Sequence, residues 1–268
     1  MGSSSRIWRV AGLFSAISTL LLLTGFLFAV MDIAKPALLN GAESALPPKT
    51  EQPAAAGNWD VTAIGDSLAK GTGDDTGNGF ARRTVELLKA QGTSSMLINN
   101  LGINGMTTEE LLASLDDQGV RYALGQSGII LLSIGGNDLF KGAEQLTSGE
   151  QLPTPAELDT SIAKASEYFR QAVGKLHEIN PQAALVYVSL YNPFSDLKEM
   201  RKLGDDAVMR WNEMALKALA PYNGTLVVPT YDLFTHNSAR YLSSDHFHPN
   251  GDGYQAIAER IVQSIGQK

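Results

Sequence analysis

The stretch DVTAIGDSL, residues 60–68, decides the fold, because a short apolar run turns directly into a glycine and a serine. We predict a strand over 60–64, which places Ser67 at the carboxyl end of that strand, where open α/β sheets hold their sites. Gly65 removes side-chain bulk from the tight turn into the next helix. The Ser67 N–H then lies near a helix N-terminus, where it can donate to an oxyanion. Gly-Asp-Ser by itself is also the sequence of an ordinary turn.

Four more short apolar runs follow and alternate with amphipathic stretches. The further predicted strands cover residues 96–101, 128–134, 184–190 and 225–229. The predicted helices cover residues 79–91, 108–117, 156–179, 205–221 and 251–265. Continuous runs of Val, Ile and Leu separated by helices indicate a mostly parallel sheet covered on both faces. We therefore predict an α/β fold, a three-layer α/β/α sandwich around a five-stranded, mostly parallel sheet. The polar segment 141–155 is long for a connection and predicts a lid or a surface insertion.

Composition and charge exclude several classes of function. The chain has 268 residues, a net charge of −7 and no cysteine. Residues 1–58 carry a net charge of +1, so the remainder carries −8, without the clustered Lys and Arg that phosphate binding needs. Nucleic acid is therefore not expected as a partner. The lack of cysteine excludes a disulfide, thiol catalysis, Cys-ligated zinc and a lipoprotein anchor.

The N-terminal segment predicts a membrane anchor. Val10 to Met31 is a run of 22 residues without charge, and as a helix it would be roughly 33 Å long, enough to cross the hydrocarbon layer. Arg6 and Arg9 precede it, and such a positive flank keeps the N-terminus in the cytoplasm. A secretory signal has a shorter apolar core with a nearby cleavage site, whereas Ala42-Glu43-Ser44 lies far beyond this run. We expect a retained single-pass anchor with the following domain outside the cytoplasm, and cleavage to a secreted form as the alternative.

Four parts of the chain follow from these patterns. They are a cytoplasmic n-region over 1–9, a transmembrane anchor or signal-anchor helix over 10–31, a Pro/Ala-rich linker over 32–58 and a globular domain over 59–268. The linker combines several prolines with no apolar period. It is therefore expected to hold the domain away from the membrane without a core of its own.

Polar residues follow three of the predicted strands and also occupy a loop near the C-terminus. A turn punctuated by glycines runs from Asn100 to Thr108, and Gly135-Gly136-Asn137-Asp138 follows the third strand. The carboxyl ends of parallel strands meet at one edge of the sheet, so we expect these segments to converge near Ser67. Asp245-His246-Phe247-His248 adds an acid and an imidazole three residues apart. A serine, a histidine and an acid are the minimum set for activating a hydroxyl as a nucleophile.

In these four blocks the chain resembles the SGNH, or GDSL-type, hydrolase family of lipases, esterases and other acylhydrolases. The blocks stand in the family's order between residues 61 and 250, as Gly65-Asp66-Ser67-Leu68, Asn100 to Gly105, Gly135 to Asp138 and Asp245 to His248. The resemblance implies a flavodoxin-like sandwich and neither a cofactor nor a metal. The anchored form with a proline-rich spacer resembles the membrane-anchored, YpmR-like branch of the family in Firmicutes.

The resemblance also implies a role for individual residues. Ser67 corresponds to the nucleophile, His248 to the general base and then acid, and Asp245 to the carboxylate that orients the histidine. The oxyanion hole is implied to consist of the backbone N–H groups of Ser67 and Gly105 together with the side chain of Asn137.

Four alternatives bear on these assignments. Gly102 is the other glycine candidate in the second block. His246 competes with His248 for the role of base, but adjacent side chains diverge, so its spacing from Asp245 is unfavourable. A metal site at this acid and these two histidines would need a further ligand cluster, which the sequence lacks. The α/β-hydrolase fold expects Gly-x-Ser-x-Gly well into the chain, whereas Ala69 stands at the second glycine position here.

We expect an extracytoplasmic serine ester hydrolase that acts through an acyl-enzyme on a small-molecule, lipid or polysaccharide ester. An O-deacetylase or acyltransferase of cell-envelope polysaccharide with the same site, and a non-catalytic tethered binding module, are the alternatives. Asp66 and Asp138 are expected to hold loop backbone rather than to transfer protons. Candidates for lining an acyl pocket, or for packing in the core, are the aromatic residues Phe140, Tyr191, Phe194 and Phe247.

Overall fold

The computed structural model describes residues 8, 12, 15–27, 58–140, 154–235 and 237–266. The chain divides into two units, Met1–Lys49 and Thr50–Lys268. In the first unit, residues 15–27 are helical. None of the helices formed by described residues is both long and apolar enough to span a bilayer.

Parts of three predicted segments lie outside the described residues. The predicted anchor over 10–31 is described only at residue 12 and over 15–27. The linker is described only at Asn58, and the predicted lid or insertion only at Thr154 and Pro155. These predictions therefore stay predictions.

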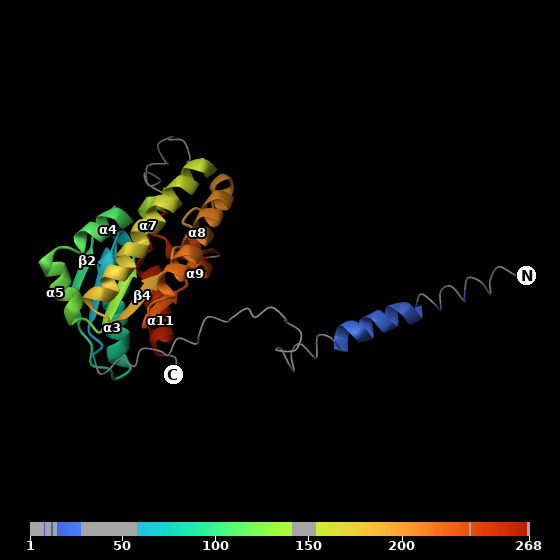
Figure 1. The fold of residues 1–268 in the computed structure, drawn as a ribbon, viewed down its shortest axis with the longest axis horizontal. Coiled ribbons are helices and arrows are strands. Elements are labelled where there is room, and N and C mark those ends of the chain that lie inside the picture. The colour runs from blue at the N-terminus through green and yellow to red at the C-terminus, as the bar shows by residue number, and fades with distance from the viewer. Residues whose placement is uncertain are drawn as a thin grey trace, which may run out of the picture. The chain divides into compact units, whose positions relative to one another are not determined.

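A five-stranded parallel sheet forms the centre of the second unit (Figure 1). Its strands are β1 (Val61–Gly65), β2 (Leu97–Gly102), β3 (Ile129–Ser133), β4 (Ala184–Val188) and β5 (Thr225–Val228). Their order is β2-β1-β3-β4-β5, and every neighbouring pair is parallel. This is the flavodoxin-like order. The predicted five-stranded parallel sheet is confirmed. Its strands could be predicted because β1, β3 and β4 are buried along their whole length, and such strands are continuous apolar runs in the sequence.

Helices cover both faces of this sheet, which confirms the three-layer sandwich (Figure 1). On β3, Ile130 and Leu132 join the hydrophobic cluster under α4, α5, α7 and α8, whereas Ile129 and Leu131 join the cluster under α3 and α11. The helices in chain order are α2 (Ser67–Lys70), α3 (Gly79–Ala90), α4 (Thr108–Ser114), α5 (Gln118–Gln126), α6 (Gly136–Phe140), α7 (Pro155–Ile179), α8 (Lys198–Leu219), α9 (Tyr231–Thr235), α10 (Ser238–Tyr241) and α11 (Gly251–Gly266).

Two helices differ from the sequence prediction. The helix α5 was not predicted, because it contains two glycines and buries only Ala123 and Leu124, too little for an apolar period. The helix α8 begins at Lys198 rather than at residue 205. Its first turns are mostly charged, and their apolar contact with the core comes only from Met200 and Leu203. Both segments contact the core, but their sequences show little of the apolar periodicity that predicts a helix.

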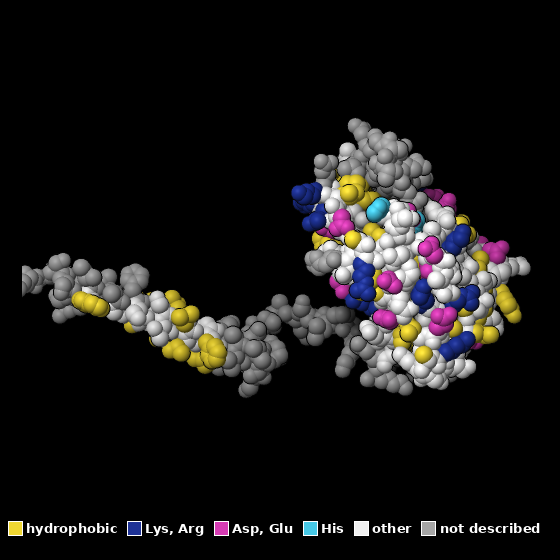
Figure 2. Space-filling view, turned by 180° about the vertical axis from the view of Figure 1, so that it is seen from behind, with side chains coloured by type: hydrophobic (Ala, Val, Ile, Leu, Met, Phe, Trp, Pro, Cys, Tyr) yellow, Lys and Arg dark blue, Asp and Glu magenta, His cyan; other side chains and the backbone are white. Residues whose placement is uncertain are grey.

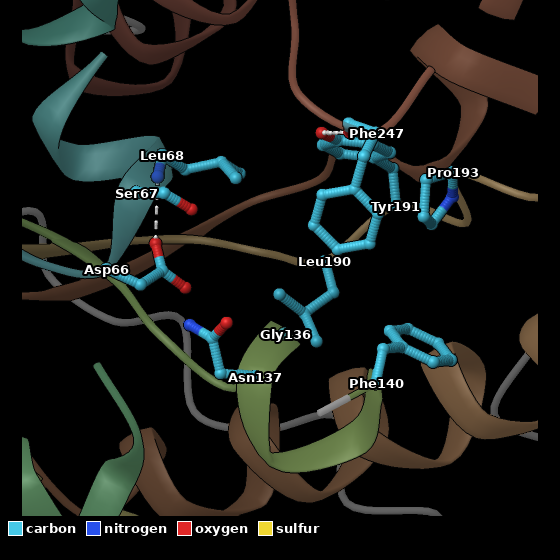
Figure 3. Close-up of a pocket in the computed structure, with 10 residues that line it drawn as sticks. All are labelled: Asp66, Ser67, Leu68, Gly136, Asn137, Phe140, Leu190, Tyr191, Pro193 and Phe247. Atoms are coloured by element: carbon cyan, nitrogen blue, oxygen red, sulfur yellow. Dashed lines mark hydrogen bonds between the residues drawn. The ribbon is translucent and has the colours of Figure 1, made fainter. Parts of the chain in front are cut away.

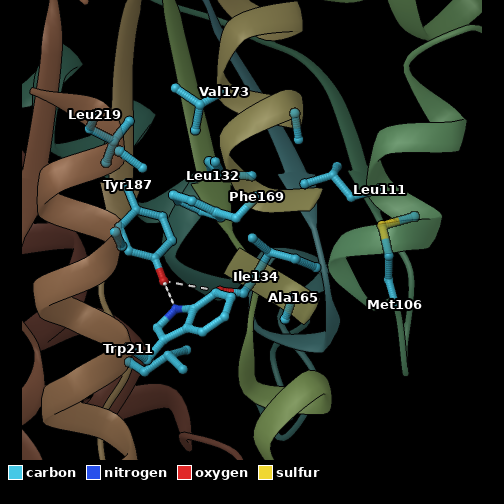
Figure 4. Close-up of a cluster of buried hydrophobic side chains, with 14 of the residues drawn as sticks. Met106, Leu111, Leu132, Ile134, Ala165, Phe169, Val173, Tyr187, Trp211 and Leu219 are labelled. Atoms are coloured by element: carbon cyan, nitrogen blue, oxygen red, sulfur yellow. Dashed lines mark hydrogen bonds between the residues drawn. The ribbon is translucent and has the colours of Figure 1, made fainter. Parts of the chain in front are cut away.

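A buried aromatic group supports the end of β3 (Figure 4). The Tyr187 hydroxyl donates to the Ile134 carbonyl oxygen at 3.0 Å, and the Trp211 indole N–H donates to that hydroxyl at 2.8 Å. Phe169 packs edge-on against both rings. Contacts with these buried rings therefore fix the backbone that connects β3 to α6.

Acidic and basic side chains are interspersed on the face of the domain shown in Figure 2. This distribution agrees with the negative net charge and with the absence of clustered Lys and Arg in the sequence.

Candidate active site

Ser67 is the first residue of α2 and follows a tight glycine turn at the end of β1. Gly65 has φ of +132°, and a Cβ there would lie 1.8 Å from the Ser133 carbonyl oxygen, so only glycine fits. Asp66 caps the helix, because its Oδ1 accepts the Leu68 N–H at 3.0 Å. The turn thereby presents the serine hydroxyl at the carboxyl edge of the sheet, as the sequence predicted.

His248 and Asp245 complete a hydrogen-bonded chain with this serine. His248 Nε2 lies 2.8 Å from Ser67 Oγ, and His248 Nδ1 lies 2.7 Å from Asp245 Oδ2. An ionised carboxylate can only accept, so Nδ1 carries the proton and the Nε2 lone pair faces the serine hydroxyl. The three side chains named from the sequence are therefore in contact, across 181 residues of chain.

Asp245 is held in place by its own turn. Its Oδ1 accepts the Ser243 hydroxyl at 2.7 Å and the backbone N–H groups of Phe247 and His248 at 2.9 Å each. Partial burial by itself raises the pKa of Asp245, but the hydrogen bonds from His248, Ser243 and the backbone outweigh it and lower the pKa to about 2. The carboxylate is therefore ionised at neutral pH, as an imidazolium partner must be.

His246 lies outside the hydrogen-bonded series of Ser67, His248 and Asp245. It has φ of +54° and an exposed side chain, whereas His248 is buried. The geometry therefore favours His248 over its competitor, in line with the spacing argument. Across the described residues, the structure holds no group of three or more His, Cys, Asp or Glu side chains able to bind a metal ion.

The turn after β3 places Asn137 beside Ser67 (Figure 3). Asn137 lies in α6, its Nδ2 donates to the Met106 carbonyl oxygen at 2.9 Å, and it lines the same cavity as Ser67. Gly135, directly before α6, has φ of +115°, and a Cβ there would lie 2.4 Å from the Trp211 ring. The turn that carries Asn137 is thus pressed against the aromatic core.

The two glycines of the second block have different surroundings. A Cβ at Gly102 would lie 2.3 Å from the Lys70 backbone nitrogen, so this glycine allows β2 to pack against α2. Gly105 has φ of +79°, and no described heavy atom lies within 4 Å of the position its Cβ would take. Gly105 therefore forms an open turn, whereas Gly102 serves packing. This difference supports the choice of Gly105 made from the resemblance.

A buried aspartate, Asp66, and a half-buried one, Asp138, hold the loops, as expected. Asp66 Oδ1 accepts the Ser133 hydroxyl at 2.9 Å, and burial raises the pKa of Asp66 to about 6 in spite of that bond. Asp138 accepts the Thr108 N–H at 3.0 Å and the Thr108 hydroxyl at 2.8 Å, and burial raises its pKa as well. The raised pKa of Asp66 was not foreseen, because sequence alone does not reveal the depth of a turn residue.

An apolar cavity opens next to the serine hydroxyl (Figure 3). The Ser67 hydroxyl and the Asn137 amide lie on one side of it, and the rings of Phe140, Tyr191 and Phe247 lie on the other. These three aromatic residues were candidates either for lining an acyl pocket or for packing in the core. Phe194, the fourth, instead packs edge-on against Phe140 at a ring distance of 5.3 Å.

The chain is similar to known lipases and acylhydrolases. A model of the GDSL-like Lipase/Acylhydrolase family matches residues 63–256, which include all four sequence blocks. The protein YpmR of Bacillus subtilis (strain 168) is 32% identical over 209 residues, 76% of this chain and 80% of that protein. The spore germination lipase LipC of Bacillus licheniformis is 26% identical over 205 residues, 75% of this chain and 93% of that one. Among solved structures, the lipase Lip_vut3 from a goat rumen metagenome has a TM-score of 0.67 at 24% identity, covering 77% of this chain and 97% of its own, and so shares the fold.

Proposed function

Because the chain belongs to the GDSL-like lipase/acylhydrolase family, we propose that it hydrolyses carboxylic esters through an acyl-enzyme on Ser67. The observation that carries this proposal is the chain of contacts from Ser67 Oγ to His248 Nε2 at 2.8 Å and from His248 Nδ1 to Asp245 Oδ2 at 2.7 Å. These are the distances at which a base can take the hydroxyl proton.

Acylation follows from this geometry. Ser67 Oγ attacks the ester carbonyl carbon while His248 Nε2 takes its proton, and Asp245 stabilises the resulting imidazolium. The carbonyl oxygen becomes an oxyanion that accepts from the N–H groups of Ser67 and Gly105 and from Asn137 Nδ2. When the tetrahedral intermediate collapses, the alkoxide leaves with the proton from Nε2, so an alcohol departs and the acyl group stays on Ser67.

Deacylation repeats these steps with water as the nucleophile. His248 takes a proton from water, the hydroxide adds to the acyl carbonyl, and the bond to Ser67 Oγ breaks. The serine recovers its proton from His248, and a carboxylic acid is released. An O-deacetylase of envelope polysaccharide needs the same three side chains, so it differs from a lipase only in the acyl and alcohol groups that it binds.

The experiment that tests the proposal compares Ser67→Ala with His246→Ala. Ser67→Ala should lose nearly all hydrolysis of p-nitrophenyl acetate and all labelling by a fluorophosphonate probe. His246→Ala should keep both, because its side chain is exposed and outside the hydrogen-bonded chain. Hydrolysis by Ser67→Ala at the parent rate would refute the proposal, and an unlabelled Ser67 in folded protein would favour a non-catalytic module.

The location proposed for the enzyme is the outer face of the cell membrane, with a retained single-pass anchor. The support is the uncharged run from Val10 to Met31 and the basic residues Arg6 and Arg9 before it. Washed membranes should retain the protein, and protease added to intact cells without a wall should digest the domain. Protein found only in the cytosol would contradict the proposal. Recovery from the medium with a new N-terminus near residue 44 would identify the cleaved, secreted form.

A further inference from the structure

The loop that follows α2 contacts two of the segments that form the candidate active site. Thr72 and Gly73 lie just after this helix. A Cβ at Gly73 would lie 2.9 Å from the His248 Cβ, so this glycine lets the loop pack directly against the histidine. The Thr72 hydroxyl donates to Asn104 Oδ1 at 2.7 Å, and Asn104 stands directly before Gly105. One short loop therefore touches both the proposed base and the glycine turn.

The backbone of Thr72 is fixed on two sides. Its N–H donates to the Ser67 carbonyl oxygen at 3.0 Å. Its carbonyl oxygen accepts the Tyr254 hydroxyl at 2.7 Å, and Tyr254 is a fully buried residue of α11. Threonine is branched at Cβ, which restricts its χ1 angle once the backbone is set. The Thr72 hydroxyl is therefore a donor with a fixed position relative to the nucleophile.

The segment that accepts this hydrogen bond is an exposed β-turn. Ile103, Asn104 and Gly105 are exposed, whereas Met106 is buried. The Met106 N–H donates to the Ile103 carbonyl oxygen at 3.2 Å, and Gly105, the third residue of the turn, has φ of +79°. A positive φ at the third residue is the mark of a type II turn.

The direction of the Gly105 N–H depends on how this turn is held. Type I and type II turns differ in the direction of the peptide group between their second and third residues. Here that group joins Asn104 to Gly105 and contains the Gly105 N–H, one of the proposed oxyanion donors. Glycine takes either sign of φ, and no described heavy atom lies within 4 Å of where a Gly105 Cβ would be, so neither intrinsic preference nor packing selects one direction. The bond from Thr72 anchors Asn104, on the other side of that peptide group.

We propose that Thr72 is a positioning residue for ester hydrolysis, whose hydroxyl holds Asn104 and thereby directs the Gly105 N–H towards the oxyanion. This inference rests on the proposed hydrolysis at Ser67. The backbone of Thr72 is bonded to Ser67 and its side chain to Asn104, so Thr72 links the nucleophile to one donor of the oxyanion hole.

The first test removes the hydroxyl in the full chain and then restores it. Thr72→Val has nearly the same shape but no hydroxyl to donate to Asn104. Loss of a whole oxyanion donor costs about 10²–10³ in kcat, so a donor that is only loosened should cost about tenfold. We expect kcat for p-nitrophenyl acetate to fall by that factor with KM within about twofold, because acylation and deacylation both pass through an oxyanion. Thr72→Ser keeps the hydroxyl and should restore kcat to within about twofold of the parent.

Thr235→Val is the matched control. Thr235 is half-buried like Thr72, and its hydroxyl also makes a hydrogen bond of 2.7 Å, to the Tyr231 carbonyl oxygen within α9. This variant should keep the parent kcat. An equal fall in kcat in Thr235→Val, or a Thr72→Ser variant as slow as Thr72→Val, would overturn the proposal, because the effect would then not come from the hydroxyl of Thr72.

The second test asks whether Thr72 acts through Asn104. Asn104→Ala removes the acceptor of the bond, and because Asn104 is exposed and has no positive φ, this variant should fold even if Thr72→Val does not. Its kcat should fall about tenfold as well. The double variant should be no slower than either single variant, because both changes break the same bond. Effects that multiply to about 100-fold would show that the two residues act separately and would overturn the proposal.

The outcomes separate this proposal from the proposed function. If Thr72→Val or Asn104→Ala keeps the parent kcat while Ser67→Ala abolishes hydrolysis, Thr72 is not a positioning residue and the ester hydrolase stands. If the parent hydrolyses no ester and a fluorophosphonate does not label Ser67, the proposed function fails, and the role of Thr72 fails with it.

Discussion

Asp66 and Asp245 both shape the surroundings of Ser67, and their pKa values shift in opposite directions. Burial raises the pKa of Asp66 to about 6 against the hydrogen bonds from Ser133 and the Leu68 N–H. At Asp245 burial also raises the pKa, but bonds from His248, Ser243 and the backbone prevail and lower it to about 2. One carboxyl is therefore charged throughout the neutral range, whereas the other changes its charge near pH 6. Each shift gives a separate prediction.

Asp245→Asn tests the role of the ionised carboxylate. The amide has nearly the same shape, but it carries no charge for the imidazolium and can hold the wrong histidine tautomer. We expect kcat for p-nitrophenyl acetate to fall about 10³–10⁴-fold while the fold is retained. Steady-state kinetics with a circular dichroism spectrum of the variant measure both. A variant within tenfold of the parent would show that Asp245 is not needed to orient His248.

Asp66→Asn tests the buried carboxyl through the pH dependence of stability. The pKa of Asp66 is higher in the folded state than its ordinary value of 3.8, so the folded state binds the proton more tightly. Its contribution is therefore complete below about pH 4 and is lost as the pH rises to about 6, by roughly 3 kcal/mol in free energy of unfolding. Urea unfolding at several pH values should show this loss in the parent and not in the variant. Parallel curves for the two proteins would contradict the assignment.

At the scale of elements, four loops at one edge of the sheet carry the candidate site residues, and three of them are held by contacts with neighbouring strands or helices. The glycine turn after β1 abuts β3 at Ser133, and the turn after β3 abuts Trp211 on α8. The loop before α11 is tied down by Tyr191, whose hydroxyl donates to the Phe247 carbonyl oxygen at 2.7 Å. The positions of the reactive groups therefore depend on packing one layer below them.

Gly135→Ala tests this dependence. A Cβ at Gly135 would lie 2.4 Å from the Trp211 ring, at a φ of +115° that alanine rarely adopts. We expect a loss of about 1–3 kcal/mol in free energy of unfolding and a fall in kcat of roughly 10²-fold, because Asn137 moves with the turn. Gly125→Ala on α5 is the control. It has φ in the ordinary range, and no described heavy atom lies within 4 Å of its added Cβ, so stability should stay or rise slightly. An unchanged kcat in Gly135→Ala would show that Asn137 is positioned independently.

The same packing explains which elements the sequence could predict. Strands β1, β3 and β4 can be recognised in the sequence because both of their faces are buried. The position of Ser67 could be predicted because it comes directly after the first of these strands. The start of α8 and the whole of α5 cannot be recognised in this way, because their few apolar residues stand among charged residues or glycines in the sequence. The contacts between Ser67, His248 and Asp245 were predictable because the sequence blocks that contain them stand in the order of a known family. A groove lined by residues of α4 and α7 was not predictable, because these residues come together only when the two helices lie side by side.

At the scale of the molecule, the second unit contains everything that the proposed chemistry needs. Both hydrophobic clusters, one on each face of the sheet, consist of described residues from Trp59 onwards. The contacts between Ser67, His248 and Asp245 also lie within this unit. Folding and hydrolysis should therefore be properties of this part of the chain, whereas location should be a property of the N-terminal segment.

Removal of residues 1–57 separates these two properties. No described residue of the first unit belongs to either hydrophobic cluster, so the truncated chain should keep its free energy of unfolding to within about 0.5 kcal/mol. Its kcat/KM for a soluble ester such as p-nitrophenyl acetate should match that of the full chain, because every side chain proposed to react lies beyond the cut. Membrane fractionation should find the full chain in the pellet and the truncated chain in the supernatant. A truncated protein that unfolds or loses activity would mean that the N-terminal segment contributes to the domain and not only to where it resides.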